Sequence, residues 1–255
     1  MLKVGIIGAR GYTGEELINI LLRHAQVKIH YLTARVDKAI AASLLFPQFQ
    51  NRLDVPVENF DASRALKLCD ILFLALPHTT SMEVAPLLLE KGKKVIDLSA
   101  DYRIEDYTLY EAWYKATHTD IGNIKRAVYG LPEINKAKIK KADFIANPGC
   151  YPTTAILSIA PLLRAQFCKL DTIIIDTKSG YSGAGRKSTD DPFMQEIRGN
   201  FKAYKVDVHQ HAPEINQELS KIAKKKISVT FVPHLLPIER GILETIYIPL
   251  RKNQK

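Results

Sequence analysis

The sequence places one cysteine where a nucleophile is expected. Cys150 follows the turn-forming run Asn147-Pro148-Gly149 and precedes residues 151–164, whose apolar spacing indicates a helix. A thiol at a helix N-terminus lies at the positive end of the helix dipole, which lowers its pKa and favours the thiolate. Cys69 and Cys168 lack such a setting and are expected to be small core residues. Cys150 is therefore the candidate nucleophile.

Two histidines and a glutamate form a candidate acid–base set. His209 and His211 lie 59 and 61 residues after Cys150, and Glu214 follows His211 at the expected start of a helix. A nucleophilic thiol needs a base, which is usually an imidazole, and Glu214 is suited to orient or polarise His211. Which histidine acts stays open. The His-x-His spacing also occurs in metal sites, but no suitably spaced further ligands follow, so no metal is expected.

A glycine-rich turn separates the first strand-like run from the first helix. Gly8, Gly11 and Gly14 have the spacing G-x-x-G-x-x-G, and Tyr12 and Thr13 lie between the last two. Glycine lets the backbone approach a pyrophosphate, and the helix N-terminus supplies amide donors. The turn predicts a dinucleotide-binding loop.

The residues after the second strand bear on which dinucleotide binds. An NAD enzyme usually has an acidic residue there for the ribose 2′-hydroxyl, whereas this chain has Thr33 and Arg35. A guanidinium pairs well with a 2′-phosphate, which favours NADP(H). The alternative is that Arg35 is a surface arginine and that Asp37 holds the ribose.

Two further arginines lie where an anionic substrate would bind. Arg103 follows a strand at the carboxyl edge of the expected sheet, where open α/β folds bind ligands. Residues 179–185 contain three glycines, among them Gly180 and Gly183, and are expected to form a loop. The loop begins at Ser179 and ends in Arg186, which suits it to contact a phosphate or a nicotinamide. The alternatives are a surface ion pair for Arg103 and a plain connector for the loop.

These residues need a scaffold, and the first part of the chain predicts an α/β one. Strand-like runs at 2–7, 27–32, 71–76 and 95–98 alternate with helix-like segments at 13–23, 63–68 and 81–90. Such alternation is typical of a parallel doubly wound sheet of the Rossmann type. A boundary near Asn147 predicts domains at residues 1–147 and 148–255.

The second part predicts an α+β domain. Helices are expected at 151–164, kinked or shortened by Pro161, and at 213–224. Strands are expected at 144–146, just before the boundary, and at 173–177, 227–232 and 242–248.

Composition limits the class of protein. The 255 residues are 46% hydrophobic and 25% charged, which excludes a disordered chain. The longest apolar run, residues 71–77, is far too short to span a membrane. Three cysteines cannot form a disulfide framework, and no leader is evident, so a cytoplasmic protein is expected. The net charge of +9 favours anionic partners. The sequence contains no nucleic-acid-binding module, so nucleic acid is not expected among them.

In combination these motifs resemble the N-acetyl-γ-glutamyl-phosphate reductases of arginine biosynthesis. The matching stretches are Gly11-Tyr12-Thr13-Gly14, Ala75-Leu76-Pro77-His78, 97–103, 129–133, 147–152, 179–186, 209–215, 233–235 and 240–241. The resemblance implies a Rossmann domain and a catalytic domain of the semialdehyde and glyceraldehyde-phosphate dehydrogenase type.

The resemblance also implies a reaction and its residues. Cys150 would attack an acyl phosphate to form a thioester, NADPH would reduce it, and His211 would serve as acid and base. Pro77 joins the cofactor-binding set. The substrate-binding set comprises Arg103, Asn147, Arg186, His209 and Arg240. A homo-oligomer without nucleic-acid or membrane partners is expected.

Family members are longer, so the resemblance implies that a final helix and strands are missing and that the fold is incomplete. Two other functions fit the same residues. One is reduction of another acyl phosphate, such as a carrier-linked aminoadipyl phosphate. The other is nucleotide binding by an inactive, shortened homologue.

Overall fold

A computed structural model describes residues 1–185, 197 and 199–251 of the chain. The chain forms two compact units: Met1–Tyr107 with Ala116–Pro148, and Thr108–Lys115 with Gly149–Lys255. This division differs from the predicted one in two places: Pro148 still belongs to the first unit, and the internal segment Thr108–Lys115 groups with the second.

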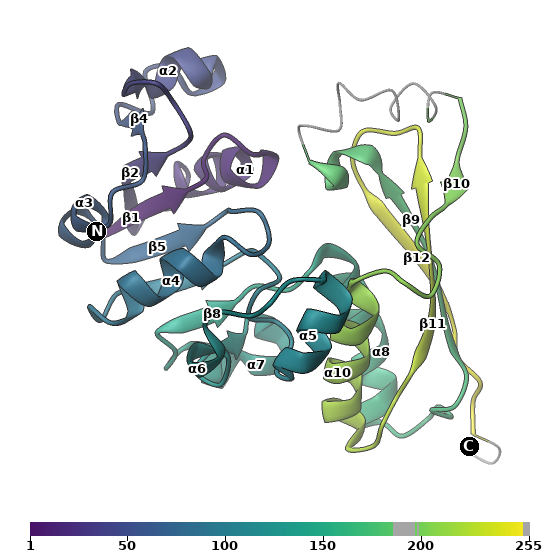
Figure 1. Ribbon diagram of the computed structural model, residues 1–255. Helices are drawn as coiled ribbons and strands as arrows, with labels where there is room; N and C mark the ends of the chain where they lie inside the picture. The colour runs from purple at the N-terminus through teal and green to yellow at the C-terminus, as the bar shows by residue number, and fades with distance from the viewer. Residues whose placement is uncertain (186–196, 198, 252–255) are drawn as a thin grey trace. The chain divides into compact units, whose positions relative to one another are not determined.

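The first unit contains an eight-stranded sheet with the order β3-β4-β2-β1-β5-β6-β8-β7. Figure 1 shows the neighbouring strands β4, β2, β1 and β5 of this sheet. Every neighbouring pair is parallel except β3 with β4. The strands are β1 (Leu2–Ile7), β2 (Val27–Thr33), β3 (Ile40–Ala41), β4 (Pro56–Glu58), β5 (Ile71–Leu74), β6 (Lys94–Asp97), β7 (Val128–Tyr129) and β8 (Phe144–Ala146). The predicted parallel, Rossmann-type sheet is confirmed.

Helices connect these strands. α1 packs against β1 and β2 through buried residues that include Ile18 and Leu21, and α4 packs against β6. The helical segments are α1 (Tyr12–Leu21), α2 (Ala42–Leu45), the 3-10 turn η1 (Pro47–Phe49), α3 (Ala62–Leu68), α4 (Ser81–Leu89), α6 (Ile121–Ile124) and α7 (Pro132–Ile139). The sequence did not predict β3, β4, β7, α2, α6 or α7, which are short and carry no clear periodicity.

The second unit contains a four-stranded sheet with the order β10-β11-β9-β12. β9 (Ile173–Gly180) is parallel to β11 (Val229–Leu236) and antiparallel to β12 (Ile242–Tyr247), and β10 (Lys202–Ala203) is antiparallel to β11. The helices are α5 (Tyr107–Tyr114), which the sequence did not predict, α8 (Cys150–Arg164), the 3-10 turn η2 (Tyr181–Ala184) and α10 (His211–Ala223).

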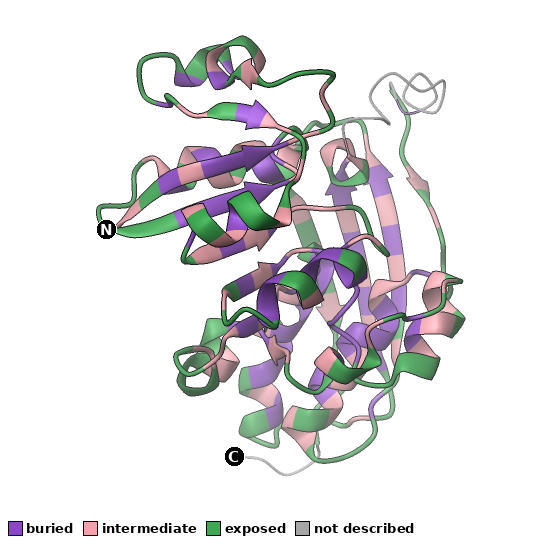
Figure 2. Cartoon of the chain, turned by 60° about the vertical axis from the view of Figure 1, so that its left-hand side comes forward, coloured by how far each residue is buried: buried purple, intermediate pink, exposed green. Residues whose placement is uncertain are grey.

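Two helices cover one face of this sheet. α8 and α10 pack against each other, α8 against β12 and α10 against β11. Along β9, Ile175, Thr177 and Ser179 are buried, whereas the alternate residues Asp176 and Lys178 are partly exposed, a pattern visible along the strands in Figure 2. The predicted α+β unit is confirmed.

Three expectations about the second unit are wrong. Ser179 and Gly180 belong to β9 and residues 181–184 form η2, because β11 and β12 pair with β9 up to its end and keep it extended. Of the two effects expected of Pro161, shortening is wrong, because α8 continues to Arg164, whereas the kink stays a prediction. β11 continues through Pro233, which an extended strand tolerates, to Leu236.

Candidate active site

The candidate nucleophile begins a helix. Cys150 is the first residue of α8, with Gly149 in extended conformation before it as the N-cap. Its side chain is exposed, whereas Cys69 and Cys168 are buried, and burial raises the pKa of the Cys69 thiol to about 12. The positive end of the α8 dipole favours the thiolate at Cys150 alone among the three cysteines.

His211 packs against the residue that precedes this cysteine. It is the first residue of α10, and a Cβ atom on Gly149 would lie 2.7 Å from His211 Nε2 and 2.9 Å from its Cε1. The imidazole therefore occupies the space that a side chain at position 149 would need. The fold brings together two residues that are 61 positions apart in the sequence.

Glu214 anchors the backbone of Gly149, the residue before Cys150. It is fully buried in the first turn of α10, and its Oε1 accepts a hydrogen bond of 2.9 Å from Gly149 N. A carboxylate that accepts a backbone N–H is a strong anchor in a buried setting. This contact fixes the turn that leads into Cys150. The orientation of His211 by Glu214 stays a prediction.

His209 is enclosed by aromatic rings. The ring centroids of Tyr151, Tyr204, Phe231 and His211 lie 5.4, 5.6, 5.4 and 4.8 Å from that of His209. Burial, with a smaller contribution from Lys205, lowers the pKa of His209 to about 4. His209 is therefore neutral at physiological pH.

The ring nitrogens of His209 have defined roles. Nδ1 accepts a hydrogen bond of 3.1 Å from His211 N, so the proton of the neutral ring is on Nε2. His209 thus supports the start of α10.

Two tyrosines that the sequence analysis did not single out complete this enclosure. Tyr151 directly follows Cys150, and its hydroxyl lies 2.8 Å from that of Tyr204. Burial raises the pKa of both phenols. The position of Tyr151 next to the nucleophile was a signal in the sequence, whereas nothing there connected Tyr204 to it.

Part of the expected glycine loop lies beside Arg240. A Cβ on Gly180 would lie 2.7 Å from Glu239 O and 2.8 Å from Arg240 N, so only glycine allows these backbones to meet. The side chain of Ser179 donates to Gly180 O, and Gly183 lies in η2. Arg240 is exposed, with its Nε 3.6 Å from a Glu239 carboxylate oxygen. Arg186 lies outside the described residues.

The predicted dinucleotide loop lies between β1 and α1 in the first unit. Gly8 has φ of +93°, and a Cβ there would lie 2.2 Å from Ala75 O, while one on Gly14 would lie 2.5 Å from Gly8 O. Packing therefore requires both glycines. A Cβ on Gly11 would meet only Gly8 O at 3.8 Å, an ordinary contact. Close approach of a ligand to the backbone is a physical reason for glycine at position 11.

The other residues of the predicted cofactor set surround this loop. Tyr12 and Thr13 form the first turn of α1. Thr33 is buried, and its side-chain oxygen and carbonyl accept hydrogen bonds from Gly8 N at 3.3 and 3.1 Å, so it supports the loop. Arg35 and Pro77 are exposed after the ends of β2 and β5.

Arg103 is anchored to backbone carbonyls. It is 6% exposed, and its Nε and Nη2 donate 2.7 Å hydrogen bonds to Asn147 O and Leu98 O. Asn147 also donates from its backbone to Asp97 O at 2.8 Å. These contacts hold the chain that leads into the turn before Cys150. Direct contact of Arg103 or Asn147 with a substrate stays a prediction.

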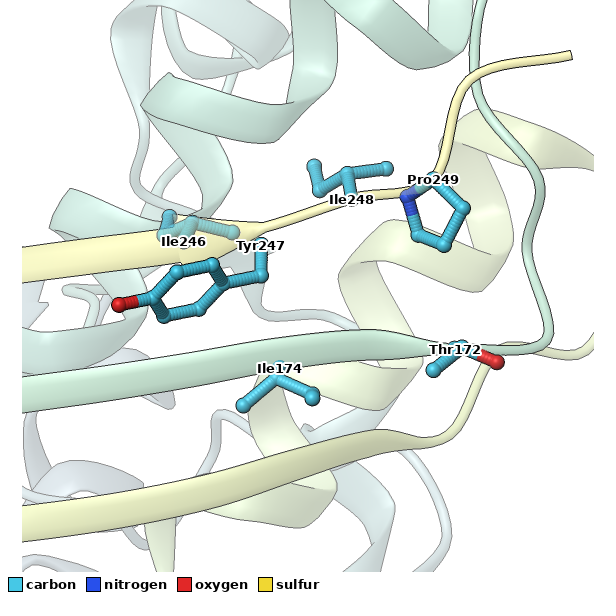
Figure 3. Close-up of a pocket in the computed structure, with 6 residues that line it drawn as sticks. All are labelled: Thr172, Ile174, Ile246, Tyr247, Ile248 and Pro249. Carbon is cyan, nitrogen blue, oxygen red and sulfur yellow. The ribbon is translucent and has the colours of Figure 1, made fainter.

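Residues 1–185, 197 and 199–251 contain no cluster of three histidine, cysteine or acidic side chains arranged to hold a metal ion. None of the helices in that same part of the chain has the length and apolar character of a membrane span. A pocket of about 460 Å³ lies at the ends of β9 and β12, lined by residues such as Ile174, Tyr247 and Pro249 (Figure 3). No predicted site residue lines it.

Known families match both units. Residues 3–142 match the semialdehyde dehydrogenase NAD-binding domain, and residues 150–255 match the semialdehyde dehydrogenase dimerisation domain. The chain is 48% identical over 248 residues to an N-acetyl-γ-glutamyl-phosphate reductase of Geotalea daltonii, and this alignment covers 97% of the chain and 71% of the relative. It is 45% identical over 255 residues to the reductase of that name from Alkaliphilus metalliredigens, covering 100% of the chain and 74% of the relative.

Solved structures share the fold at low identity. Aspartate semialdehyde dehydrogenase II from Vibrio cholerae aligns with a TM-score of 0.71 at 21% identity, over 98% of this chain and 75% of that one. The enzyme from Candida albicans, solved with NADP, aligns with a TM-score of 0.69 at 18% identity, over 100% and 73%.

Proposed function

The chain belongs to the N-acetyl-γ-glutamyl-phosphate reductase family, and we propose that it reduces N-acetyl-γ-glutamyl phosphate with NADPH through a thioester on Cys150. The observation that carries this mechanism is the packing of His211 Nε2 against Gly149, directly before an exposed cysteine at a helix N-terminus.

The first half of the reaction loads the cysteine. The Cys150 thiolate attacks the acyl carbon, a carbon–sulfur bond forms, and the bond from carbon to the phosphate oxygen breaks with release of phosphate. The α8 N-terminus stabilises the thiolate before attack. Glu214 keeps the preceding turn in place through Gly149 N.

The second half releases the aldehyde. NADPH, when bound, supplies the hydride that adds to the thioester carbonyl carbon. His211 donates a proton to the oxygen of the resulting thiohemiacetal and then removes it again as the carbon–sulfur bond breaks. The products are the semialdehyde and the Cys150 thiolate, so this half uses no net proton. The one proton consumed overall is taken up by the phosphate that leaves in the first half.

The glycine loop fits a dinucleotide in this chain. Gly8 and Gly14 are required by packing, whereas Gly11 keeps backbone accessible at the N-terminus of α1. Arg35 is exposed beyond the end of β2, where a guanidinium would pair with a 2′-phosphate, which supports NADPH over NADH. The match of residues 150–255 to a dimerisation domain supports a homo-oligomer, which light scattering after size exclusion would measure.

The reverse reaction tests the proposal. The protein is incubated with N-acetylglutamate semialdehyde, phosphate and NADP⁺, and NADPH absorbance is followed. We expect phosphate-dependent formation of NADPH, absent in Cys150→Ser, because a serine hydroxyl is far harder to deprotonate than a thiol. Equal rates with and without phosphate would contradict the acyl-phosphate assignment.

A further inference from the structure

The backbone is held by two hydrogen bonds where it enters the turn before Cys150. Asn147 N donates to Asp97 O at 2.8 Å, and Asn147 O accepts from Arg103 Nε at 2.7 Å. Pro148 follows, and because proline has no N–H, the peptide group between Asn147 and Pro148 can form a hydrogen bond only through Asn147 O. Arg103 therefore makes the contact that fixes this peptide group.

The rest of the turn is bound as well. Pro148 O accepts a hydrogen bond of 3.2 Å from Asn147 Nδ2, and Gly149 N donates one of 2.9 Å to Glu214 Oε1. The proline ring also restricts φ at position 148. The turn is therefore stiff, and a shift of Asn147 would move the backbone that leads into Cys150.

Arg103 makes this contact with a particular pair of donors. It is 6% exposed, and its Nη2 donates to Leu98 O at 2.7 Å. Nε–H and Nη2–H point to the same side of the guanidinium and form the fork that commonly binds two oxygens of a carboxylate or a phosphate. In this structure the fork holds two backbone carbonyls, one just after β6 and one just after its neighbour β8.

We propose that Arg103 is a positioning residue of the proposed reductase: it holds Asn147 O and thereby sets the backbone that carries Cys150, and it does not bind the phosphate group. This inference rests on the proposed function. The family resemblance implied instead that Arg103 contacts the substrate. The two roles differ in their kinetics, since a phosphate ligand acts on KM for phosphate, whereas a positioning residue acts on kcat.

Two substitutions separate these roles. Arg103→Lys keeps the positive charge but has a methylene group in place of Nε, so the donor to Asn147 O is lost. Arg103→Met loses both the charge and the donor. The reverse reaction is assayed at varied phosphate concentration and below the melting temperature of each variant, so that unfolding does not contribute.

We expect both variants to lower kcat about 100-fold, because a displacement of about 1 Å in a reacting group can have that effect, while KM for phosphate changes by less than about twofold. Wild-type kcat in either variant would overturn the inference. So would a KM for phosphate that rises about tenfold or more in Arg103→Met and less in Arg103→Lys, because a charged phosphate ligand would give that result.

Arg126→Lys is the matched control. Arg126 Nε also donates a hydrogen bond, to Asp143 Oδ1 at 3.1 Å, but Asp143 precedes β8 and so lies at the opposite end of this strand from Asn147. The same loss of Nε at position 126 should leave kcat and KM for phosphate unchanged.

A crystal of the wild-type protein soaked in phosphate tests the inference without a substitution, and therefore also if the variants do not fold. We expect Arg103 to keep both of its carbonyl contacts. A phosphate ion bound by Nε and Nη2 in place of the carbonyls would overturn the inference. A wild-type protein that forms no NADPH in the reverse reaction would instead contradict the proposed function.

Discussion

His211 Nε2 lies 2.7 Å from the point where a methyl group on Gly149 would be. This contact aligns the imidazole with the start of α8, and it makes position 149 sensitive to the smallest side chain. We expect Gly149→Ala to lower kcat roughly 100-fold, since a displacement of about 1 Å in a reacting group can have that effect. NADPH affinity should be unchanged, because the predicted dinucleotide loop lies in the other unit.

A second glycine provides the control for this substitution. Nothing lies within 4 Å of a Cβ built on Gly122, so Gly122→Ala should leave both kcat and NADPH affinity unchanged. Full activity in Gly149→Ala would show that the His211 position is irrelevant to turnover.

The two histidines should behave differently in catalysis. His211→Asn removes the proposed acid and base and should lower kcat by roughly 100- to 10,000-fold, with the kcat–pH profile losing its imidazole limb. His209→Asn should keep that limb, because His209 is neutral with a pKa of about 4 and does not titrate near pH 7. The opposite result, with the limb lost only in His209→Asn, would reassign the acid–base role.

The buried His209 should also make stability depend on pH. Its folded pKa of about 4 lies below the unfolded value of about 6.5, so the unfolded chain binds the extra proton between these values. His209 therefore lowers the free energy of unfolding as pH falls from about 6.5 to about 4, by up to about 3 kcal/mol.

Denaturant unfolding of the wild type and His209→Gln from pH 7.5 to 4 measures this effect. Asp97 acts in the opposite direction. Burial raises its folded pKa to about 6, so its contribution to the free energy of unfolding falls as pH rises from about 4 to about 6. The difference between the two proteins removes the Asp97 contribution, which both share. A difference that is constant with pH would show that His209 is protonated equally in the folded and unfolded states.

Arg35 should select the phosphorylated cofactor. A guanidinium paired with a 2′-phosphate contributes roughly 1.5–3 kcal/mol, so Arg35→Ala should weaken NADPH binding about tenfold or more and leave NADH binding nearly unchanged. Both dissociation constants are measured by fluorescence titration.

Asp37, exposed two residues further on, tests the alternative. If Asp37 held the ribose hydroxyl, Asp37→Ala would weaken NADH binding. Arg35→Ala would then change the binding of NADPH and NADH to the same extent. Our proposal expects Asp37→Ala to leave NADPH affinity unchanged.

Local sequence features were sufficient to predict much of the scaffold. The apolar runs of β1 and β5 and the glycine turn after β1 are local patterns, and they predicted these strands and the loop that leads into α1. Cys150 begins α8, as expected from the turn that precedes it. The short segments β7 and α6 were not predicted, because two to four residues are too few to show a hydrophobic period.

The candidate site was predictable only in part. The enclosure of His209 by Tyr151, Tyr204 and Phe231 joins residues up to 80 positions apart, and no local pattern encodes such a contact. Ser179 was expected in a loop because glycines follow it. Pairing of β9 with strands on both sides outweighs the turn preference of those glycines.

Peptide mass spectrometry detects whether a thioester forms on Cys150 during the reaction. The protein is mixed with N-acetyl-γ-glutamyl phosphate without NADPH, quenched in acid and digested. We predict that the acetylglutamyl group is found on the peptide that contains Cys150, that NADPH added before the quench discharges it as semialdehyde, and that Cys150→Ser carries no adduct. An enzyme that turns over with NADPH yet never acylates Cys150 would exclude the thioester mechanism.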